Sequence, residues 1–146
     1  MHVFCLADFK EAVGKLAKSK AYATIEQTII EHFCGKTVEQ VRNGTILNNS
    51  DTVPYIKKRL EGSGGFRAYF LLLIKNDCLY LMYIHPKRGP EGSENITDEA
   101  KKAFYKKVLT CIKSDDGLYH VVPDATRSKL LFPVKKKGEL APTALS

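Results

Sequence analysis

The sequence lacks the clustered cysteines of zinc-binding and disulfide-rich proteins. Its four cysteines, Cys5, Cys34, Cys78 and Cys111, are far apart, and no two of them form a Cys-x-x-Cys pair. Each lies in an apolar pattern, which predicts buried free thiols and favours the reducing cytoplasm. The histidines are scattered as well and show no zinc-ligand spacing with the cysteines. We therefore expect no metal site and no cofactor.

Long apolar runs are also missing. The apolar segment 66–74 is too short to span a bilayer and is interrupted by Arg67. Residues 1–6 have neither the basic start nor the long apolar stretch of a secretory signal. These two absences predict a protein that is neither exported nor embedded in a membrane.

The glycine-rich segment 62–65 lacks the strand-to-helix context of a dinucleotide or triphosphate loop.

Positive charge, in contrast, is in excess. The chain has 23 lysines and arginines against 16 acidic residues, a formal net charge of +7. Such a charge favours an anionic partner, which leaves nucleic acid, an acidic protein segment and a membrane surface open. A length of 146 residues with 44% hydrophobic content is typical of one soluble domain. We expect the domain to occupy 1–134 and the lysine-rich end, 135–146, to be a mobile tail.

Two helical patterns precede the strand patterns. Apolar residues recur at helical spacing in 9–16 and 25–33, and alternating or continuous apolar runs follow at 55–60, 66–74 and 78–85. Residues 37–40, Thr-Val-Glu-Gln, have the form of a capping box that opens a short third helix. Residues 2–6 add a short strand pattern, and Thr97 is the expected N-cap of a helix that reaches Ser114. Segments 118–122 and 130–134 are predicted to be short strands. The pattern predicts an α+β fold with a sheet of about four strands and helices packed on one face.

Basic residues gather at the ends of the predicted strands. Three precede the glycine turn, one follows it, and three close the next strand: Lys57, Lys58, Arg59, Arg67, His85, Lys87 and Arg88. A meander brings such residues to one end of the sheet, where they would form a cationic cleft suited to a phosphodiester. Because only alternate residues of a strand share a face, Lys57 and Arg59 form one set and Lys58 the other.

The turn between the two apolar strands decides the partner of His85. A two-residue turn at Asn76 and Asp77 pairs His85 with Ala68, whereas a three-residue turn pairs it with Arg67. The sequence leaves both registers open.

The order of these pieces resembles the RelE/HigB group of toxin–antitoxin toxins. The resemblance rests on a basic strand, the string Gly62-Ser-Gly-Gly-Phe-Arg-Ala-Tyr69, an apolar strand, Asp77-Cys-Leu-Tyr-Leu81, Lys87 and Asn95-Ile-Thr-Asp-Glu99. It implies a RelE-like antiparallel sheet and a ribosome-dependent messenger-RNA endonuclease. In such enzymes the 2′-hydroxyl of the RNA attacks the adjacent phosphate, without a metal. The resemblance also implies a cognate antitoxin as partner, beside ribosome and messenger RNA.

The resemblance also suggests roles for individual residues. Arg67 matches the arginine of the Gly-Gly-x-Arg motif and is expected to stabilise the transition state, and Lys87 matches the lysine that closes the last strand. Arg59 is a further catalytic candidate, and His85 is either a proton carrier or a histidine that merely ends a strand. The expected RNA-binding residues are Lys57, Lys58, Arg88, Tyr69 and Tyr83. The two tyrosines would stack on a base or pack across strands.

Two other functions remain open from the sequence. The chain could have the same fold without nuclease chemistry and bind a protein target, as ParE-like gyrase poisons do. It could also be a non-enzymatic RNA-binding module, for which net charge would suffice. Segment 118–146 departs from the resemblance, and an added sheet edge, an antitoxin dock and a disordered end are the alternatives for it.

Overall fold

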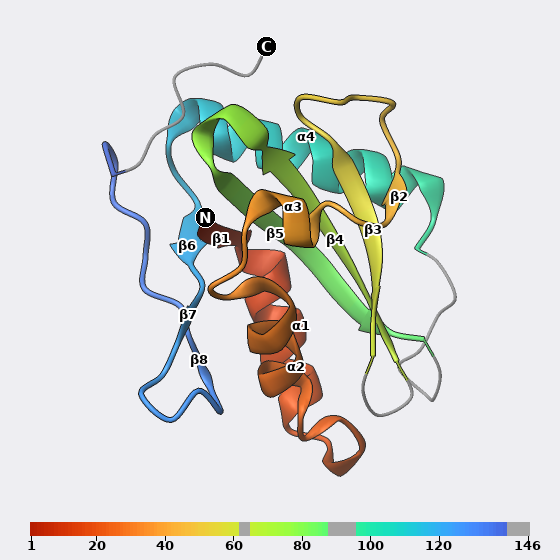
Figure 1. Ribbon diagram of the computed structural model, residues 1–146, viewed down its shortest axis with the longest axis vertical. Coiled ribbons are helices and arrows are strands. Elements are labelled where there is room, and N and C mark those ends of the chain that lie inside the picture. Colours follow the sequence, from red (N-terminus) through yellow and green to blue (C-terminus); the bar gives the residue numbers. More distant parts are fainter. Residues whose placement is uncertain (62–64, 88–95, 140–146) are drawn as a thin grey trace.

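A computed structural model describes residues 1–61, 65–87 and 96–139 of the chain (Figure 1). It has α+β architecture, as the sequence predicts. The elements are, in chain order, β1 (His2–Leu6), α1 (Ala7–Ala17), η1 (Lys20–Tyr22), α2 (Ile25–Phe33), α3 (Val38–Val41), β2 (Thr45–Ile46), β3 (Tyr55–Leu60), β4 (Phe66–Leu73), η2 (Ile74–Asn76), β5 (Cys78–Pro86), α4 (Asp98–Ser114), β6 (Leu118–His120), β7 (Val122–Pro123) and β8 (Leu130–Leu131).

The main sheet is mixed and has the strand order β2-β3-β4-β5-β1-β6. Strand β1 runs parallel to β5, and the other neighbours are antiparallel. The expectation of an antiparallel sheet of about four strands is therefore wrong for this chain. Phe4, Cys5 and Leu6 are fully buried, so β1 takes an interior position between β5 and β6 rather than an edge.

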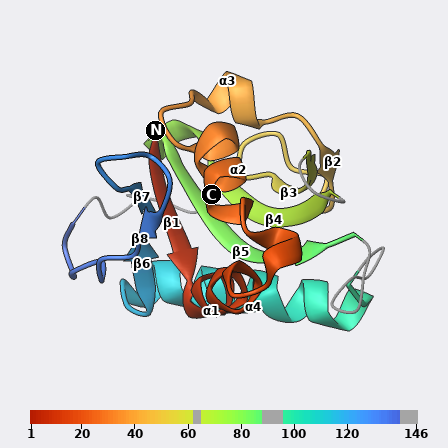
Figure 2. The same cartoon turned by 90° about the horizontal axis from the view of Figure 1, so that it is seen from below.

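Helices cover both faces of the sheet. Phe9 and Val13 of α1 and Ile29 of α2 pack on one face, whereas Val108 and Ile112 of α4 pack on the other. Seen from below, α4 lies on the opposite side of the strands from α2 and α3 (Figure 2). The expectation of helices on one face is thus corrected. Strand β4 is buried along its whole length, and a strand that is apolar at both parities needs cover on both sides.

The helix signals in the sequence correspond to real helices. The Thr37 hydroxyl accepts a hydrogen bond from the Gln40 amide, and the Gln40 side chain accepts one from the Thr37 amide, which completes the expected capping box. The Thr97 hydroxyl caps α4 by accepting from the Ala100 amide at 3.1 Å. The Thr37 contacts fix where α3 begins, and the Thr97 contact fixes where α4 begins.

The connection between β4 and β5 differs from both expected turns. Leu73 pairs with Cys78, so residues 74–77 form the loop, and Asp77 adopts a left-handed conformation with φ 55°. A bulge then shifts the register by one residue at Tyr69. The loop and the bulge together bring His85 opposite Arg67. The pairing of His85 with Arg67, expected from a three-residue turn, is therefore produced by a four-residue loop and a bulge.

The end of the described chain packs on the domain. Strand β6 is an added edge of the main sheet, and β7 pairs with β8 in a separate two-stranded sheet. Lys135 is buried, and its Nζ lies 2.6 Å from Asp115 Oδ1 at the C-terminal end of α4. The Gly138 amide donates to the other carboxylate oxygen of Asp115. The fold thus extends past Val134 at least to position 139, and residues 140–146 lie outside the described part.

Candidate functional site

Three basic side chains lie in one row across β3, β4 and β5, next to the last residue pairs of these strands. Arg59 of β3 pairs with Arg67 of β4, and Arg67 pairs with His85 of β5. The next row on the same face contains Lys57, Tyr69 and Tyr83. Tyr69 belongs to the core layer under α4, so both rows face α4.

Like charges directly opposite each other destabilise a sheet. Arg59 and Arg67 form such a pair, with Lys57 one pleat away from both. Burial lowers the pKa of Lys57 most. Repulsion from the charges of Arg67, Lys101 and Arg59 lowers it further. An anion bound here would reduce this repulsion, and the arrangement therefore suits a phosphate group.

Exposure falls along the row from the sheet edge inward. Arg59 is exposed, whereas Arg67 is 5% and His85 is 4% exposed. A cavity of about 450 Å³ opens on the exposed end, and its described lining comprises four basic residues and no carboxylate: Asn43, Gly44, Thr45, Lys57, Lys58, Arg59 and Arg67. A ligand that enters this cavity meets arginine and lysine before it meets histidine.

Gly44 shapes the rim of this cavity. Its φ is +140°, and a Cβ atom at this position would lie 2.7 Å from both the Lys57 carbonyl oxygen and Ile56 Cγ2. Only glycine lets the chain cross β3 so closely before β2 begins. The sequence alone does not reveal this role of Gly44, because an Asn-Gly pair indicates only a turn.

His85 is held as a neutral imidazole. Its Nδ1 lies 3.1 Å from the Pro86 carbonyl oxygen, which can only accept, so Nδ1 carries the hydrogen in this contact. Nε2 faces the Tyr69 hydroxyl at 3.4 Å. Burial lowers the pKa of His85 most, the Pro86 carbonyl opposes this effect, and the charges of Arg67 and Lys57 lower the pKa further. Such a histidine can accept a proton at neutral pH.

The two tyrosines pack rather than present their rings. Tyr69 is 0% exposed and stacks on His85 with ring centroids 5.7 Å apart, so a base cannot reach its ring. Tyr83 is half-buried and stacks on Phe104 of α4 at 5.0 Å. The expected base-stacking role of Tyr69 is therefore corrected, and the alternative of cross-strand packing is confirmed. Burial also raises the pKa of Tyr69, while the Ile96 amide and Arg67 act in the other direction.

The remaining predicted residues lie outside the row. Lys58 points to the opposite face, where its Nζ is 6.0 Å from the centroid of the Phe33 ring, as strand alternation predicts. Lys87 follows β5 directly, is half-buried, and its amide donates to the Gly65 carbonyl at 3.1 Å, which places it at the open end of the β4–β5 hairpin. Arg88 lies outside the described residues.

Lys101 is a further basic residue near the row, and the pattern of basic residues at strand ends did not place it in the site. It lies on α4, one turn after the Thr97 cap, and its charge contributes to the lowered pKa of Lys57. Its Nζ is also 3.6 Å from Asp98 Oδ1. The available signal was the group of lysines in the first turns of the helix that follows β5 in the chain. That signal becomes useful only once α4 is known to cover this face.

Comparisons with known proteins do not assign the site. No protein-family model matches the chain, and no curated protein matches its sequence. In the ranges 1–61, 65–87 and 96–139 there is no group of three or more histidine, cysteine or acidic side chains placed to hold a metal ion. No helix within these ranges combines the length and apolar character needed to cross a membrane.

Proposed function

We propose that this protein is a metal-independent endoribonuclease of the RelE/HigB toxin type, which cuts messenger RNA on the ribosome and is neutralised by a cognate antitoxin. The observation that carries the proposal is the row Arg59–Arg67–His85, in which two guanidinium groups and a neutral imidazole lie side by side. The likeness to RelE-type toxins itself rests on the residue pattern. It is supported by helices α1 and α2, which precede the β3–β4–β5 meander in the chain.

The proposed reaction is an in-line attack within the RNA. His85 Nε2 takes the proton of the 2′-hydroxyl, and the 2′-oxygen forms a bond to the adjacent phosphorus. Arg67 and Arg59 bind the non-bridging oxygens, whose negative charge grows in the transition state. The bond to the 5′-oxygen breaks, and this oxygen takes a proton from a lysine. The products are a 2′,3′-cyclic phosphate and a free 5′-hydroxyl.

Two lysines are candidates for the acid that protonates the leaving oxygen. Lys57 shares the face of the row, and its lowered pKa makes it a better proton donor than an ordinary lysine. Lys87 lies at the open end of the hairpin, beyond Pro86. Alanine substitution of each lysine in turn distinguishes them. The lysine that acts as the acid is the one whose loss slows cleavage of ordinary RNA but not of RNA with a leaving group of low pKa.

The burial of His85 supports the dependence on the ribosome. With 4% of its surface exposed, the imidazole is poorly accessible to free RNA. A bound strand that is already bent and oriented by the ribosome lowers the cost of reaching it. We therefore expect slow cleavage of naked RNA by the purified protein. The proposal also implies a cytoplasmic protein, because translating ribosomes are found there.

The cationic cavity also supports the existence of an antitoxin. The side chains of Lys57, Arg59 and Arg67 on this face attract an acidic segment, and a protein segment that covers them would block the phosphate site. Co-expression of the product of the neighbouring gene should then restore growth. Failure of that product to bind or neutralise the protein would count against the toxin assignment.

The experiment that tests the proposal is induction of the protein in cells, followed by mapping of messenger-RNA ends and measurement of replication. Cuts inside translated codons that disappear in Arg67→Ala at equal expression support the nuclease. Intact RNA with stalled replication supports a gyrase poison instead. Intact RNA with normal replication supports a non-enzymatic RNA-binding module, which would need no accessible proton acceptor at His85.

A further inference from the structure

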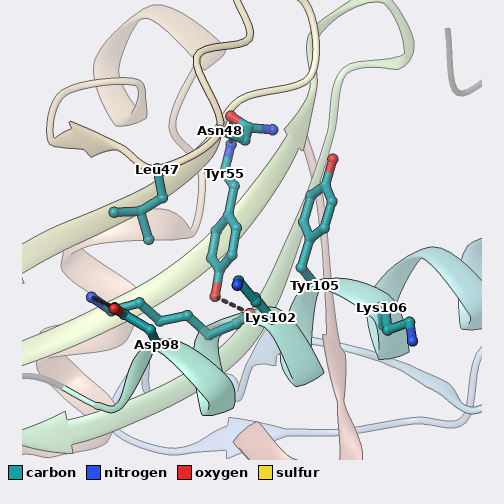
Figure 3. A pocket seen from close by; sticks show the side chains of 8 residues that line it. Leu47, Asn48, Tyr55, Asp98, Lys102, Tyr105 and Lys106 are labelled. Carbon is teal, nitrogen blue, oxygen red and sulfur yellow. Dashed lines mark hydrogen bonds and ion pairs between the residues drawn. The ribbon is translucent and has the colours of Figure 1, made fainter.

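A second and larger cavity lies next to the proposed phosphate site, between α4 and the loop that follows β2 (Figure 3). Its volume is about 610 Å³, within the range of small-molecule sites. Leu47 and Asn48 form one side of it, and residues of the first two turns of α4 form the other. The cavity is separate from the row of Arg59, Arg67 and His85, and the proposed reaction assigns it no role.

Two tyrosine rings form the aromatic wall of this cavity. Tyr55 of β3 and Tyr105 of α4 are nearly parallel, with an interplanar angle of 4° and centroids 5.4 Å apart. Tyr55 is buried, and its hydroxyl donates to the Lys101 carbonyl oxygen at 3.0 Å. Tyr105 is half-buried, and in Figure 3 its hydroxyl points away from that of Tyr55. Because Tyr55 covers one face of the Tyr105 ring, a planar ligand in the cavity would stack on the other face of Tyr105.

The charge of the cavity is positive. Asp98 is the one acidic residue in the described part of its lining, and the carboxylate pairs with Lys101 at 3.6 Å. Lys102 and Lys106 also line the cavity, and neither has an acidic partner among the described residues. Both are exposed. The site thus combines an aromatic and aliphatic wall with two ammonium groups at its rim.

We propose that this cavity binds one nucleotide of single-stranded RNA, with its base stacked on Tyr105 and its phosphate between Lys102 and Lys106. Stacking on an aromatic ring beside a cationic track is the common way in which proteins hold single strands without reading their sequence. An acidic peptide would use the lysines but leave the tyrosine wall without a planar partner.

The cavity continues the proposed active site. Tyr55 precedes Lys57 by two residues on the same face of β3, and Lys101 borders the cavity while its charge acts on Lys57. A strand whose scissile phosphate lies at Arg59 and Arg67 can therefore place a neighbouring nucleotide here. The inference rests on the proposed function in this respect, because the nucleotide is taken to belong to the RNA that the row cuts.

The test measures binding of an RNA that cannot be cleaved. A fluorescent 2′-O-methyl oligoribonucleotide has no free 2′-hydroxyl, so fluorescence anisotropy reports affinity without turnover. Tyr105→Leu keeps an apolar side chain but removes the ring and should weaken binding about fivefold or more, whereas Tyr105→Phe should bind like the parent. Thermal melting of each variant verifies that the domain is folded.

Lys102→Ala tests the phosphate contact with a matched control. Lys113 lies on α4 eleven residues later, outside the cavity, and Lys113→Ala changes the net charge equally. We expect Lys102→Ala to reduce the slope of log affinity against log salt by about 0.7, and Lys113→Ala to leave it nearly unchanged.

The outcomes separate this inference from the proposed function. Binding that depends on the Tyr105 ring supports the nucleotide site, even if ribosome-bound RNA stays intact. Intact ribosome-bound RNA would contradict only the proposed nuclease activity. Cleavage by the parent with equal affinity of Tyr105→Leu, Lys102→Ala and Lys113→Ala overturns the nucleotide site and leaves the nuclease standing. Absence of oligonucleotide binding by the folded parent also overturns it.

Discussion

The two faces of the sheet are built from the same strands but differ in chemistry. On the face under α1 and α2, β4 contributes Phe66, Phe70 and Leu72, which are fully buried or nearly so in an apolar layer. On the α4 face the same strand contributes Arg67 and Tyr69. The first face holds the fold together, and the second combines packing with a charge pattern that costs stability.

The α4 face itself changes from one side to the other. Near β1 it is a closed apolar layer, in which Phe4 and Tyr80 stack at 5.3 Å and Val108 is fully buried. Near β3 it opens into the two cavities and carries the basic cluster of Arg59 and Arg67. Because the helix packs tightly on only one side, the other side of this face is accessible to a ligand.

The largest expected effect lies on the α1–α2 face. Phe70 is fully buried and meets Phe33 edge-to-face at 5.3 Å, so Phe70→Ala removes both packing and the aromatic contact. We expect a loss of about 3–5 kcal/mol in the free energy of unfolding. Denaturant titration measures it, with Phe70→Leu as a milder control. A loss below that of Phe70→Leu would show that this face is not the main source of stability.

The next effect concerns activity on the α4 face. Arg67→Ala should reduce cleavage of ribosome-bound messenger RNA by about a hundredfold or more, since it removes a preorganised donor to the transition state. Its effect on the free energy of unfolding should be smaller than that of Phe70→Ala. Arg67→Lys keeps the charge but loses the planar fork and should fall between parent and alanine. Equal toxicity of Arg67→Ala and parent at equal expression would refute the site.

Arg59→Ala should reduce cleavage without reducing stability, whereas Phe70→Ala mainly reduces stability. Arg59 is exposed and stands opposite Arg67, so its removal relieves repulsion and should leave the free energy of unfolding unchanged within about 0.5 kcal/mol, or raise it slightly. Cleavage should nevertheless fall. A clear destabilisation would mean that Arg59 has a structural role that the charge argument ignores. Melting and cleavage assays on one preparation give both answers.

The pH dependence of stability contains a smaller signal from His85. Its pKa is lowered in the folded state, so the unfolded chain binds more protons below the ordinary histidine pKa of about 6.5. This contribution to stability is present above pH 6.5 and is lost as the pH falls through 6.5 towards the lowered pKa, by at most about 1.4 kcal/mol per pH unit. His85→Gln should flatten the unfolding free energy in this range. His32, whose pKa burial also lowers, remains in both proteins, so only the difference between them is informative.

Local patterns predicted the helices and the strands β3, β4 and β5, because caps and apolar periodicity are short-range signals. The helices beginning after Thr37 and Thr97 are examples. The alternation of Lys57 and Lys58 between faces was also predictable from strand geometry. The cover of both faces, the parallel β1–β5 pair and the packing of Lys135 on Asp115 were not, because these features join residues far apart in the chain.

The candidate site was predictable in composition but not in geometry. Arg67 and His85 could be chosen from their strand-end positions, whereas their pairing depends on a bulge that no residue type announces. Tyr69 was misassigned because a tyrosine in a strand has the same pattern whether it is buried or exposed. Lys101 was not placed in the site, since a helix lysine becomes relevant only when the helix is placed over the sheet.

The most direct test of the central claim uses ribosomes translating a defined messenger RNA, with and without a single 2′-deoxy nucleotide at the mapped cut. The account predicts that the purified protein cuts the ordinary RNA to a 2′,3′-cyclic phosphate and a 5′-hydroxyl, in the presence of a metal chelator that leaves the ribosomes intact. It predicts that Arg67→Ala does not cut and that the deoxy-substituted site resists the parent. Cleavage at the deoxy site, or no cleavage of either RNA by the folded parent, would contradict the account.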